Sequence, residues 1–508
     1  MNKNFNIPVY INYGKKNFFY CFNQYKKFLK TVPYEKLQFK NDFNQFSGII
    51  VSPRNNSGIP WCNITIAFLY AYKNVPFKII LDDLNFLDPE WRDQLNAVEE
   101  VVESICNNLN TSYLKTSNQV DAELDDFDLR EIKRLSIVNG IWNVRNIIPS
   151  EKLNQYIKLS YATLEENAKK IKQLYSKNVF DHCIHQSLVN NNGGLHKHFG
   201  LKFGTRVSCI DMSMGRGLVG IKDVPGYHFD LPDIINKNVP EFLDSKKNRK
   251  IAISEGIKEH KLRKQGQDSR AYQIVSTYKS DIPPEADILI PVNILWDAAS
   301  LGRNRFFETP LHWLIETIEF ILSKTTAKIV VRQHPGERRF EIYGTGKKLG
   351  EYLRNKFLDH PRLRFISYND NVNTYLLIEK CKVVLPYTST VGLEAALMGK
   401  KVILESTVYY KDQTFVQSAD SKKDYFEKIK KAYEEFDTGR QASDPVPGGD
   451  TGWILYFLLN KCNAVYSDFG LDPKDFEKWT KKSFDLLCQD NNLMTAIEAL
   501  IQKSLLHI

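Results

Sequence analysis

Short apolar runs alternate with amphipathic segments between residues 285 and 440. The runs are rich in β-branched residues, and the segments between them carry apolar residues at helical spacing. The pattern predicts strands over 287–293, 328–333, 362–368, 382–387 and 401–406, and helices over 308–324, 350–358, 373–381 and 391–399. Strands that are apolar on both faces and alternate with helices are typical of a parallel, doubly wound sheet.

The N-terminal half shows a looser version of the same alternation. Strands are expected over 7–13, 48–53, 78–83, 179–185 and 205–211, and helices over 61–73 and about 151–175, with a short helix in the glycine-containing loop before residue 205. The polar, basic segment 245–270 is expected to be a linker or a mobile flap. A Pro/Gly-rich break at 441–450 precedes a stretch, 451–508, that is expected to be helical.

These patterns predict an α/β protein in which two Rossmann-like, doubly wound domains face each other across a cleft. The expected parts are an N-terminal domain over 1–280, a C-terminal domain over 281–440 and a helical segment over 441–508 that packs on the domains. Ligands of such folds bind in the cleft.

Composition and charge narrow the function. Of the 508 residues, 43% are hydrophobic and 25% are charged, which is ordinary for a globular chain. The net charge of +9 suits anionic partners such as sugar nucleotides, and it is too weak to predict nucleic-acid binding. The N-terminal 50 residues are basic, which fits either a solvated face or contact with anionic lipid head groups.

The cysteines and the apolar runs bear on location. The eight cysteines are scattered without a CxxC pair, which argues against a structural zinc site and a disulfide framework. The N-terminus has no apolar signal-peptide region, and no run approaches the ~20 apolar residues of a membrane span. We therefore expect a cytoplasmic protein, at most bound to the inner face of the cytoplasmic membrane.

Polar residues follow three strands of the C-terminal half. Because the carboxyl ends of parallel strands share one edge of a sheet, these residues are expected to converge on one rim. The candidates for catalysis are His334 and Asp297. The candidates for donor binding are Arg332, Pro335, Glu337, Thr388, Ser389, Thr390, Gly392 and Glu394.

The segment 387–402 carries the clearest signal. Its hydroxyls precede a predicted helix, whose free N–H groups and dipole favour a phosphate. The alternative is that Ser389 or Thr390 only caps the helix. Glu394 does not have the spacing of a capping box on Thr390, so it is a candidate to accept hydrogen bonds from ribose hydroxyls.

Pro335 favours an extended turn at His334, where the imidazole can donate to a phosphate oxygen or protonate a leaving group. A purely structural role for His334 is the alternative. Asp297 can be a catalytic carboxylate or a helix cap, and Trp296 can stack on a base or sugar or fill the core.

The N-terminal half offers weaker candidates for binding the acceptor or a phosphate, each with a structural alternative. They are Arg54, Asn55, Ser57, Gly58, Asp82 and Arg216. The four histidines His182, His185, His196 and His198 lack the HExxH pattern, so no metal site is predicted from them.

Several of these motifs resemble those of bacterial capsule and surface polysaccharide glycosyltransferases of the GT-B fold, including the Kdo-transferase-like and sialyltransferase-like groups. The similarity lies in the HP pair at 334–335, the Ser-Thr pair with its following glutamate at 389–394, the WDAA segment at 296–299 and the GYHFDLPD stretch at 226–233.

The resemblance implies a nucleotide-activated donor, CMP- or UDP-linked, bound by the C-terminal domain, and a saccharide or glycolipid acceptor bound by the N-terminal one. It places His334 at the donor phosphate with Ser389 and Thr390 nearby. It implies no cofactor and no bound metal, because helix dipoles and side chains neutralise the leaving phosphate. The acidic-acidic-Gly motif of sialyltransferase-like members has no clear copy, so the catalytic base stays open.

Three alternatives remain at this point. The chain can be a sugar-nucleotide 2-epimerase of the same fold, or a polyol-phosphate transferase that uses a CDP-linked donor. It can also be a non-catalytic component of a polysaccharide assembly complex that binds glycan or nucleotide.

Overall fold

The computed structural model describes most of the chain and divides it into two compact units. Unit 1 comprises Met1–Ile137, Lys158–Leu231 and Lys461–Ile508, and unit 2 comprises Val138–Ile157 and Pro232–Asn460. The described residues are 9–37, 46–53, 58–84, 91–185, 191–211, 218–223, 240, 243–267, 279–297, 300–338, 345–437, 449–461, 464–469 and 473–502. The units divide the chain differently from the expected domains, since residues 138–157 join unit 2 and the C-terminal segment joins unit 1.

Unit 1 is built on a mainly parallel sheet. Its described strands lie in the order β13-β6-β5-β4-β1-β2-β3, and the five from β5 to β3 are parallel. Strand β6 runs antiparallel to β5, and β13 runs antiparallel to β6. The bounds are β1 Phe46–Val51, β2 Phe77–Leu81, β3 Tyr113–Lys115, β4 Phe180–Ile184, β5 Arg206–Asp211, β6 Leu218–Asp223 and β13 Ala464–Tyr466.

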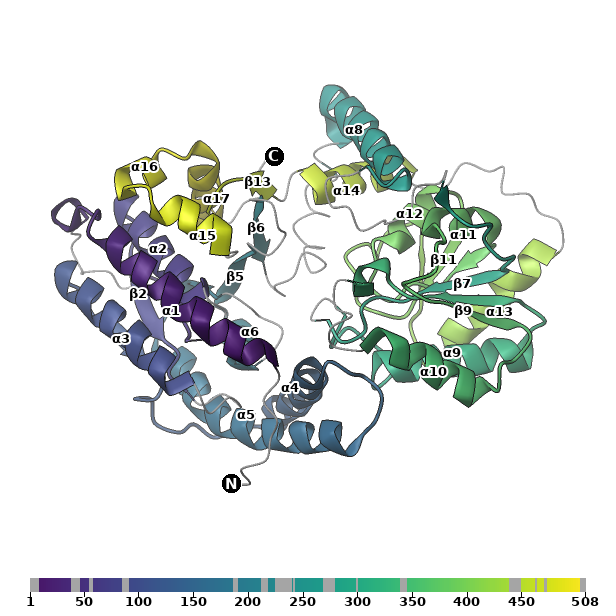
Figure 1. The fold of residues 1–508 in the computed structure, drawn as a ribbon, viewed down its shortest axis with the longest axis horizontal. Helices are drawn as coiled ribbons and strands as arrows, with labels where there is room; N and C mark the ends of the chain where they lie inside the picture. Colours follow the sequence, from purple (N-terminus) through teal and green to yellow (C-terminus); the bar gives the residue numbers. More distant parts are fainter. Residues whose placement is uncertain are drawn as a thin grey trace. The chain divides into compact units, whose positions relative to one another are not determined.

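Helices cover both faces of this sheet. Neighbouring residues of a strand point to opposite faces, and both faces carry apolar side chains that the helices bury. Ile49 of β1 packs in a core with α1, α2, α3 and the C-terminal helices, whereas Ile50 packs in a second core with α5 and α6. The helices are α1 Val9–Leu29, α2 Ile59–Tyr72, α3 Trp91–Asn108, α4 Asp126–Val144, α5 Glu151–Lys177, α6 Asn191–Lys202, α15 Pro473–Thr480, α16 Phe484–Cys488 and α17 Asn491–Gln502, with a 3₁₀ turn at Tyr34–Lys36. The C-terminal helices lie beside α1 and α2 (Figure 1).

The strand expected over 7–13 is wrong, because α1 begins at Val9; residues 7 and 8 lie outside the described part. Further along this helix Phe18, Cys21, Tyr25 and Phe28 recur at helical spacing and are buried. Their aromatic rings pack around Trp61 and Trp479. The helical period of these large side chains outweighs the short alternation at the N-terminus.

Unit 2 contains a fully parallel sheet. Its strands lie in the order β12-β11-β10-β7-β8-β9. They are β7 Ile288–Pro291, β8 Ile329–Arg332, β9 Leu363–Ile366, β10 Val383–Val384, β11 Lys401–Leu404 and β12 Gln417–Ser418. When the six strands are numbered from 1 at β7 to 6 at β12, their order across the sheet from β9 is 3-2-1-4-5-6, which is the order of a Rossmann fold. The chain adds strands on one side of β7 as far as β9 and then on its other side from β10, so the strand order reverses between β7 and β10. The predicted doubly wound fold is confirmed.

Helices flank the sheet of unit 2 as the sequence predicts. Helices α9 and α10 lie on one side of the strands, and α11 and α12 lie on the other (Figure 1). The helices are α8 Lys246–Lys264, α9 Pro310–Lys324, α10 Thr345–Phe357, α11 Thr374–Lys380, α12 Val391–Leu397, α13 Lys422–Asp437 and α14 Gly449–Lys461. None of the helices in the described part of the chain is long and apolar enough to cross a bilayer.

The segment expected as a linker or flap, 245–270, forms α8 over residues 246–264 instead; residues 268–270 lie outside the described part. Ser245 caps the helix by accepting the N–H of Asn248 at 3.4 Å. The buried face of α8 includes His260 and Arg263, whose polarity hides the stripe in a hydropathy pattern. Gly256 lies so close to α14 that a Cβ there would be 2.6 Å from the carbonyl oxygen of Trp453.

Candidate functional site

One side chain bridges the switch point of unit 2, the place between β7 and β10 at which the strand order reverses. Asn293 follows β7 and is 7% exposed, and its Oδ1 accepts the backbone N–H of Thr388 at 3.1 Å. This bond joins the segments that leave β7 and β10, where the strand order reverses. Open α/β sheets bind their ligands beyond the carboxyl ends of the strands at such a point.

His334 follows β8, the strand on the other side of β7. Its Nδ1 accepts the backbone N–H of Gly336 at 3.0 Å. In a neutral ring this acceptor role leaves the proton on Nε2, which can then donate to another group. A Cβ at position 336 would lie 2.8 Å from Nδ1 of His334, so the glycine is required for this orientation. Pro335 is half-buried beside His334, and no contact of its own marks it as a ligand-binding residue.

Glu337 lies at the end of the same turn and is 5% exposed. Gln333 hydrogen-bonds to its carboxylate, and among the described residues Oε2 has no hydrogen-bond partner. The pKa of Glu337 is raised to about 7, mainly by burial; the hydrogen bond from Gln333 opposes the rise and the charge of Asp297 adds to it. A carboxyl group with a pKa near neutrality can take up and release a proton. Asp297, on the turn after β7, therefore lies electrostatically coupled to Glu337.

We expect Glu337 to make stability depend on pH. Its folded-state pKa lies above the ordinary value of 4.5, so the folded protein binds the proton more tightly and loses stability as pH rises from about 4.5 to about 7. The shift corresponds to about 3 kcal/mol. The difference in free energy of unfolding between Glu337→Gln and wild type should therefore shift in favour of the variant, by up to about 3 kcal/mol, when the pH is raised from 4.5 to 8. Urea unfolding at the two pH values measures the difference.

Glu405 supplies the control for this prediction, because burial also raises its pKa to about 7. In Glu337→Gln the contribution of Glu405 should persist, so the pH dependence is reduced rather than abolished. An unchanged pH dependence in Glu337→Gln would show that the Glu337 carboxyl is solvated.

The sequence predicts that the first N–H groups of α12 are free to bind a phosphate, but in the structure they have acceptors within the protein. The N–H of Val391 donates to the Oγ of Ser389 at 3.2 Å, and that of Gly392 to the Ser389 carbonyl at 3.0 Å. The N–H of Glu394 donates to Thr390, and that of Leu393 to the Tyr410 hydroxyl. All four groups are thus already engaged, because the segment forms a tight turn above Tyr410.

The hydroxyl residues of this segment differ in access. Thr388 is fully buried and Ser389 is 8% exposed, so the Ser389 hydroxyl is explained by the turn without a ligand. Thr390 is half-buried and its side chain makes no capping bond to the helix. Of the three, Thr390 is the residue that the structure leaves suited to contact a ligand.

Gly392 and Glu394 have internal roles. A Cβ at 392 would lie 2.1 Å from the Tyr410 hydroxyl, so the glycine is needed for packing. Glu394 is 1% exposed, and its carboxylate accepts from the hydroxyls of Tyr375 and Tyr456, each at 2.9 Å. It also pairs with Arg263 at 3.1 Å. In this structure these partners occupy the carboxylate, so a ribose would have to displace them to bind Glu394.

Arg332 and Trp296 are also part of the packed interior. The guanidinium of Arg332 is buried and donates to the carbonyls of Ser367 and Val372, the latter at 3.0 Å. Burial lowers the pKa of Arg332 to about 10. Trp296 is 5% exposed and its ring lies 4.8 Å from the guanidinium of Arg145. The guanidinium of Arg332 is thus bonded to the loop after β9, and the expected donor contact of Arg332 stays a prediction.

In the N-terminal half, the predicted residues Arg54, Asn55, Ser57 and Arg216 lie outside the described residues. Gly58 precedes α2 and is buried. Asp82 follows β2 and is fully buried, with both carboxylate oxygens accepting from the amide of Asn192 at 3.1 and 3.2 Å.

Sequence reasoning missed two residues that organise unit 2. Asn293 bridges the segments after β7 and β10, and its place as the last residue of the predicted strand 287–293 was the only signal for it. Arg263 lies on α8, 131 positions before its partner Glu394, and its segment reads as a polar linker. No local pattern links the two.

The fold is that of a protein of two doubly wound α/β units. Unit 2 has the strand order of a Rossmann fold, with Asp297 on the turn after β7 and His334 and Glu337 on the turn after β8. Residues 302–432, about a quarter of the chain, match the family of capsule polysaccharide biosynthesis proteins. The matched segment includes the HP pair and the Ser-Thr pair, so the predicted resemblance is confirmed there. No curated protein sequence matches the chain.

Solved structures with low similarity include two KpsC transferases of Thermosulfurimonas dismutans. The beta Kdo 2,4 transferase is 10% identical with a TM-score of 0.34, over 61% of this chain and 94% of that one. The beta Kdo 2,7 transferase is 14% identical with a TM-score of 0.33, over 71% and 98%. The UDP-GlcNAc 2-epimerase of Methanocaldococcus jannaschii, bound to UDP-GlcNAc and UDP, is 12% identical with a TM-score of 0.25, over 80% and 97%. The chain's own strand order defines its fold.

Proposed function

We propose that this protein is a glycosyltransferase that moves a sugar from a nucleotide-activated donor to a growing capsular polysaccharide. The observation that carries the proposal is the switch point of unit 2, where the segments after β7, β8 and β10 meet inside or beside the part matched by the capsule family. A Rossmann switch point is the usual site for a nucleotide.

The proposed reaction joins an acceptor hydroxyl to the anomeric carbon of the donor sugar while the bond to the donor phosphate breaks. His334 donates its Nε2 proton to the phosphate oxygen on which charge develops, and such fixed donors are effective because they need no reorganisation. The Asp297–Glu337 pair is the candidate for holding the proton that the acceptor loses, since Glu337 has a pKa of about 7.

The finer parts of the proposal concern partners and location. The donor is a CMP- or UDP-sugar bound by unit 2, and the acceptor is a saccharide or glycolipid bound by unit 1. We also propose that the protein works at the inner face of the cytoplasmic membrane, with the basic residues of the first 50 positions toward anionic lipid.

A thermal-shift screen with CMP, UDP, GDP and CDP tests the proposed site. A ligand that binds only the folded state stabilises it by about 2.7 kcal/mol at a hundred times its Kd. We expect CMP or UDP to raise the melting temperature of wild type, and the rise to shrink in His334→Ala and Thr390→Val. Wild type that responds to none of the nucleotides would contradict the proposal.

Product analysis then separates transfer from epimerisation. The purified protein is incubated with sugars linked to the nucleotide that raised its melting temperature, with and without an acceptor glycan. Conversion of the donor to its epimer without acceptor would identify an epimerase, whereas nucleotide release that depends on acceptor supports transfer.

A further inference from the structure

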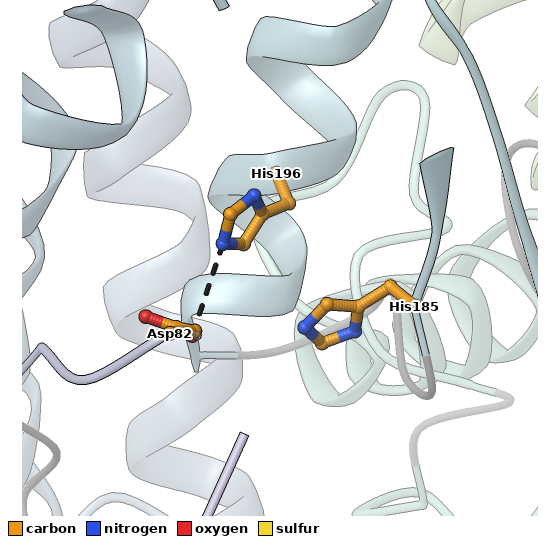
Figure 2. A group of neighbouring side chains, drawn as sticks. All are labelled: Asp82, His185 and His196. Atoms are coloured by element: carbon orange, nitrogen blue, oxygen red, sulfur yellow. Dashed lines mark ion pairs between the residues drawn. The ribbon is translucent and has the colours of Figure 1, made fainter. Parts of the chain in front are cut away.

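Three buried side chains of unit 1 come together beyond the carboxyl ends of its strands. Asp82 follows β2, His185 follows β4, and His196 lies on α6 (Figure 2). One ligand atom from each lies within 4.8 Å of those of the other two. Backbone bonds fix the strand ends, since the N–H of Asp82 donates to Val51 and that of His185 to Ser208.

The burial of this cluster calls for a compensating partner. Asp82 and His196 are fully buried, and His185 is 2% exposed. The Nε2 of His196 faces the Oδ2 of Asp82 at 3.8 Å, too far for a hydrogen bond (Figure 2). Among the described residues this Nε2 has no hydrogen-bond partner. Buried ring nitrogens are nearly always bonded, so an atom aimed at a carboxylate without a bond points to a ligand between them.

The other nitrogen of His196 is held by a neighbour. The hydroxyl of Tyr175 lies 3.2 Å from Nδ1 of His196 and also hydrogen-bonds with Cys183. When this hydroxyl donates to the Cys183 sulfur, its oxygen accepts the Nδ1 proton of His196. Nε2 then carries a lone pair toward Asp82. Metal-binding histidines have this arrangement, in which the distal N–H is fixed by an outer hydrogen bond.

We propose that Asp82, His185 and His196 bind a divalent transition-metal ion of the zinc class. Two imidazoles and one carboxylate suit zinc, whose bonds to such ligands are about 2.0–2.2 Å long. Ligand atoms around a tetrahedral ion with these bonds lie about 3.3 Å apart, so the cluster needs to contract by about 0.5–1.5 Å. The ion neutralises the buried carboxylate and joins β2, β4 and α6, and its fourth position is left for a small ligand.

This proposal does not rest on the proposed donor site, because all three residues belong to unit 1 and the donor site is proposed in unit 2. The sequence hid the site for two reasons. Asp82 is distant from both histidines along the chain, and the spacing of His185 and His196 fits no metal motif.

Cobalt titration of the full-length protein, stripped of metal with a chelator, tests the site. We expect one Co²⁺ per chain, with the visible absorption of a four- or five-coordinate nitrogen and oxygen site and without a thiolate charge-transfer band. Added Zn²⁺ should abolish this spectrum and raise the melting temperature. Wild type that binds no stoichiometric metal, or that binds it through thiolate, would overturn the proposal whatever the variants do.

Matched variants locate the ion. His196→Gln and Asp82→Asn should weaken Co²⁺ binding by at least tenfold, and Tyr175→Phe, which keeps all three ligands, should weaken it by about tenfold or more. The control is His198→Gln, a buried histidine of the same helix that bonds Asp128 instead, at 2.8 Å. It should keep the cobalt spectrum. A spectrum that survives in His196→Gln would show that Asp82 and His196 form only a buried ion pair.

Discussion

Replacing His334 with alanine is expected to reduce sugar transfer by about a hundredfold or more while leaving the fold intact. The imidazole is half-buried, and its Nδ1 accepts the Gly336 N–H, so in the neutral ring the proton lies on Nε2, the atom proposed to donate to the phosphate. Removing it deprives the departing phosphate of a fixed donor. Initial rates with the donor identified by thermal shift, together with circular dichroism and the melting temperature, measure the effect.

Two further variants sharpen this test. His312→Ala removes an exposed histidine of α9 in the same unit and should leave transfer unchanged. Gly336→Ala keeps the imidazole but places a methyl group 2.8 Å from its Nδ1, so it should lower kcat by turning the ring. Full activity in His334→Ala would remove His334 from the proposed mechanism.

Replacing Glu394 with alanine is expected to destabilise unit 2 by about 3–5 kcal/mol, because it leaves buried partners of a charge unpaired. The carboxylate lies between Arg263 of α8, Tyr375 of α11 and Tyr456 of α14. Loss of the pair leaves the Arg263 guanidinium, 9% exposed, without its carboxylate. Chemical denaturation with a fluorescence readout measures the change.

Glu379→Ala is the matched control, since Glu379 of α11 pairs at the surface with Lys264, which lies on α8 next to Arg263. Exposed pairs contribute about 0–1 kcal/mol, so this variant should be close to wild type. The sequence-based role of Glu394 makes the opposite prediction. If Glu394 holds a ribose, Glu394→Ala would lose nucleotide binding and keep its stability.

Most helices and strands of unit 2 could be predicted from the hydrophobic period, because the central strands β7 and β8 are apolar and buried on both faces. Thus 308–324 forms α9 and 401–406 contains β11, with only end residues differing. The same reasoning failed for α1 and α8. In these helices the buried stripe is built from aromatic side chains or from paired polar ones, and a polar residue reads as exposed until its partner is known.

The candidate site likewise has a part that the sequence predicts and a part that depends on tertiary contacts. The sequence placed His334 on an extended turn after a strand, because Pro335 restricts the preceding residue. It could not separate a ligand contact from an internal bond at Ser389 or Glu394. That difference depends on Tyr410 and Arg263, which reach these residues from segments distant in the chain.

What the sequence alone determined is therefore most of the local order of strands and helices and the resemblance to capsule glycosyltransferases, and from these it predicted the rim at which chemistry is proposed. These depend on short-range periodicity and on residues that act where a strand ends. Only the tertiary structure decided which polar groups are engaged inside the protein and that Asp82 meets His185 and His196. Those outcomes depend on contacts between distant segments, and the free energy of burying a charge is set by its partners rather than by its neighbours in the chain.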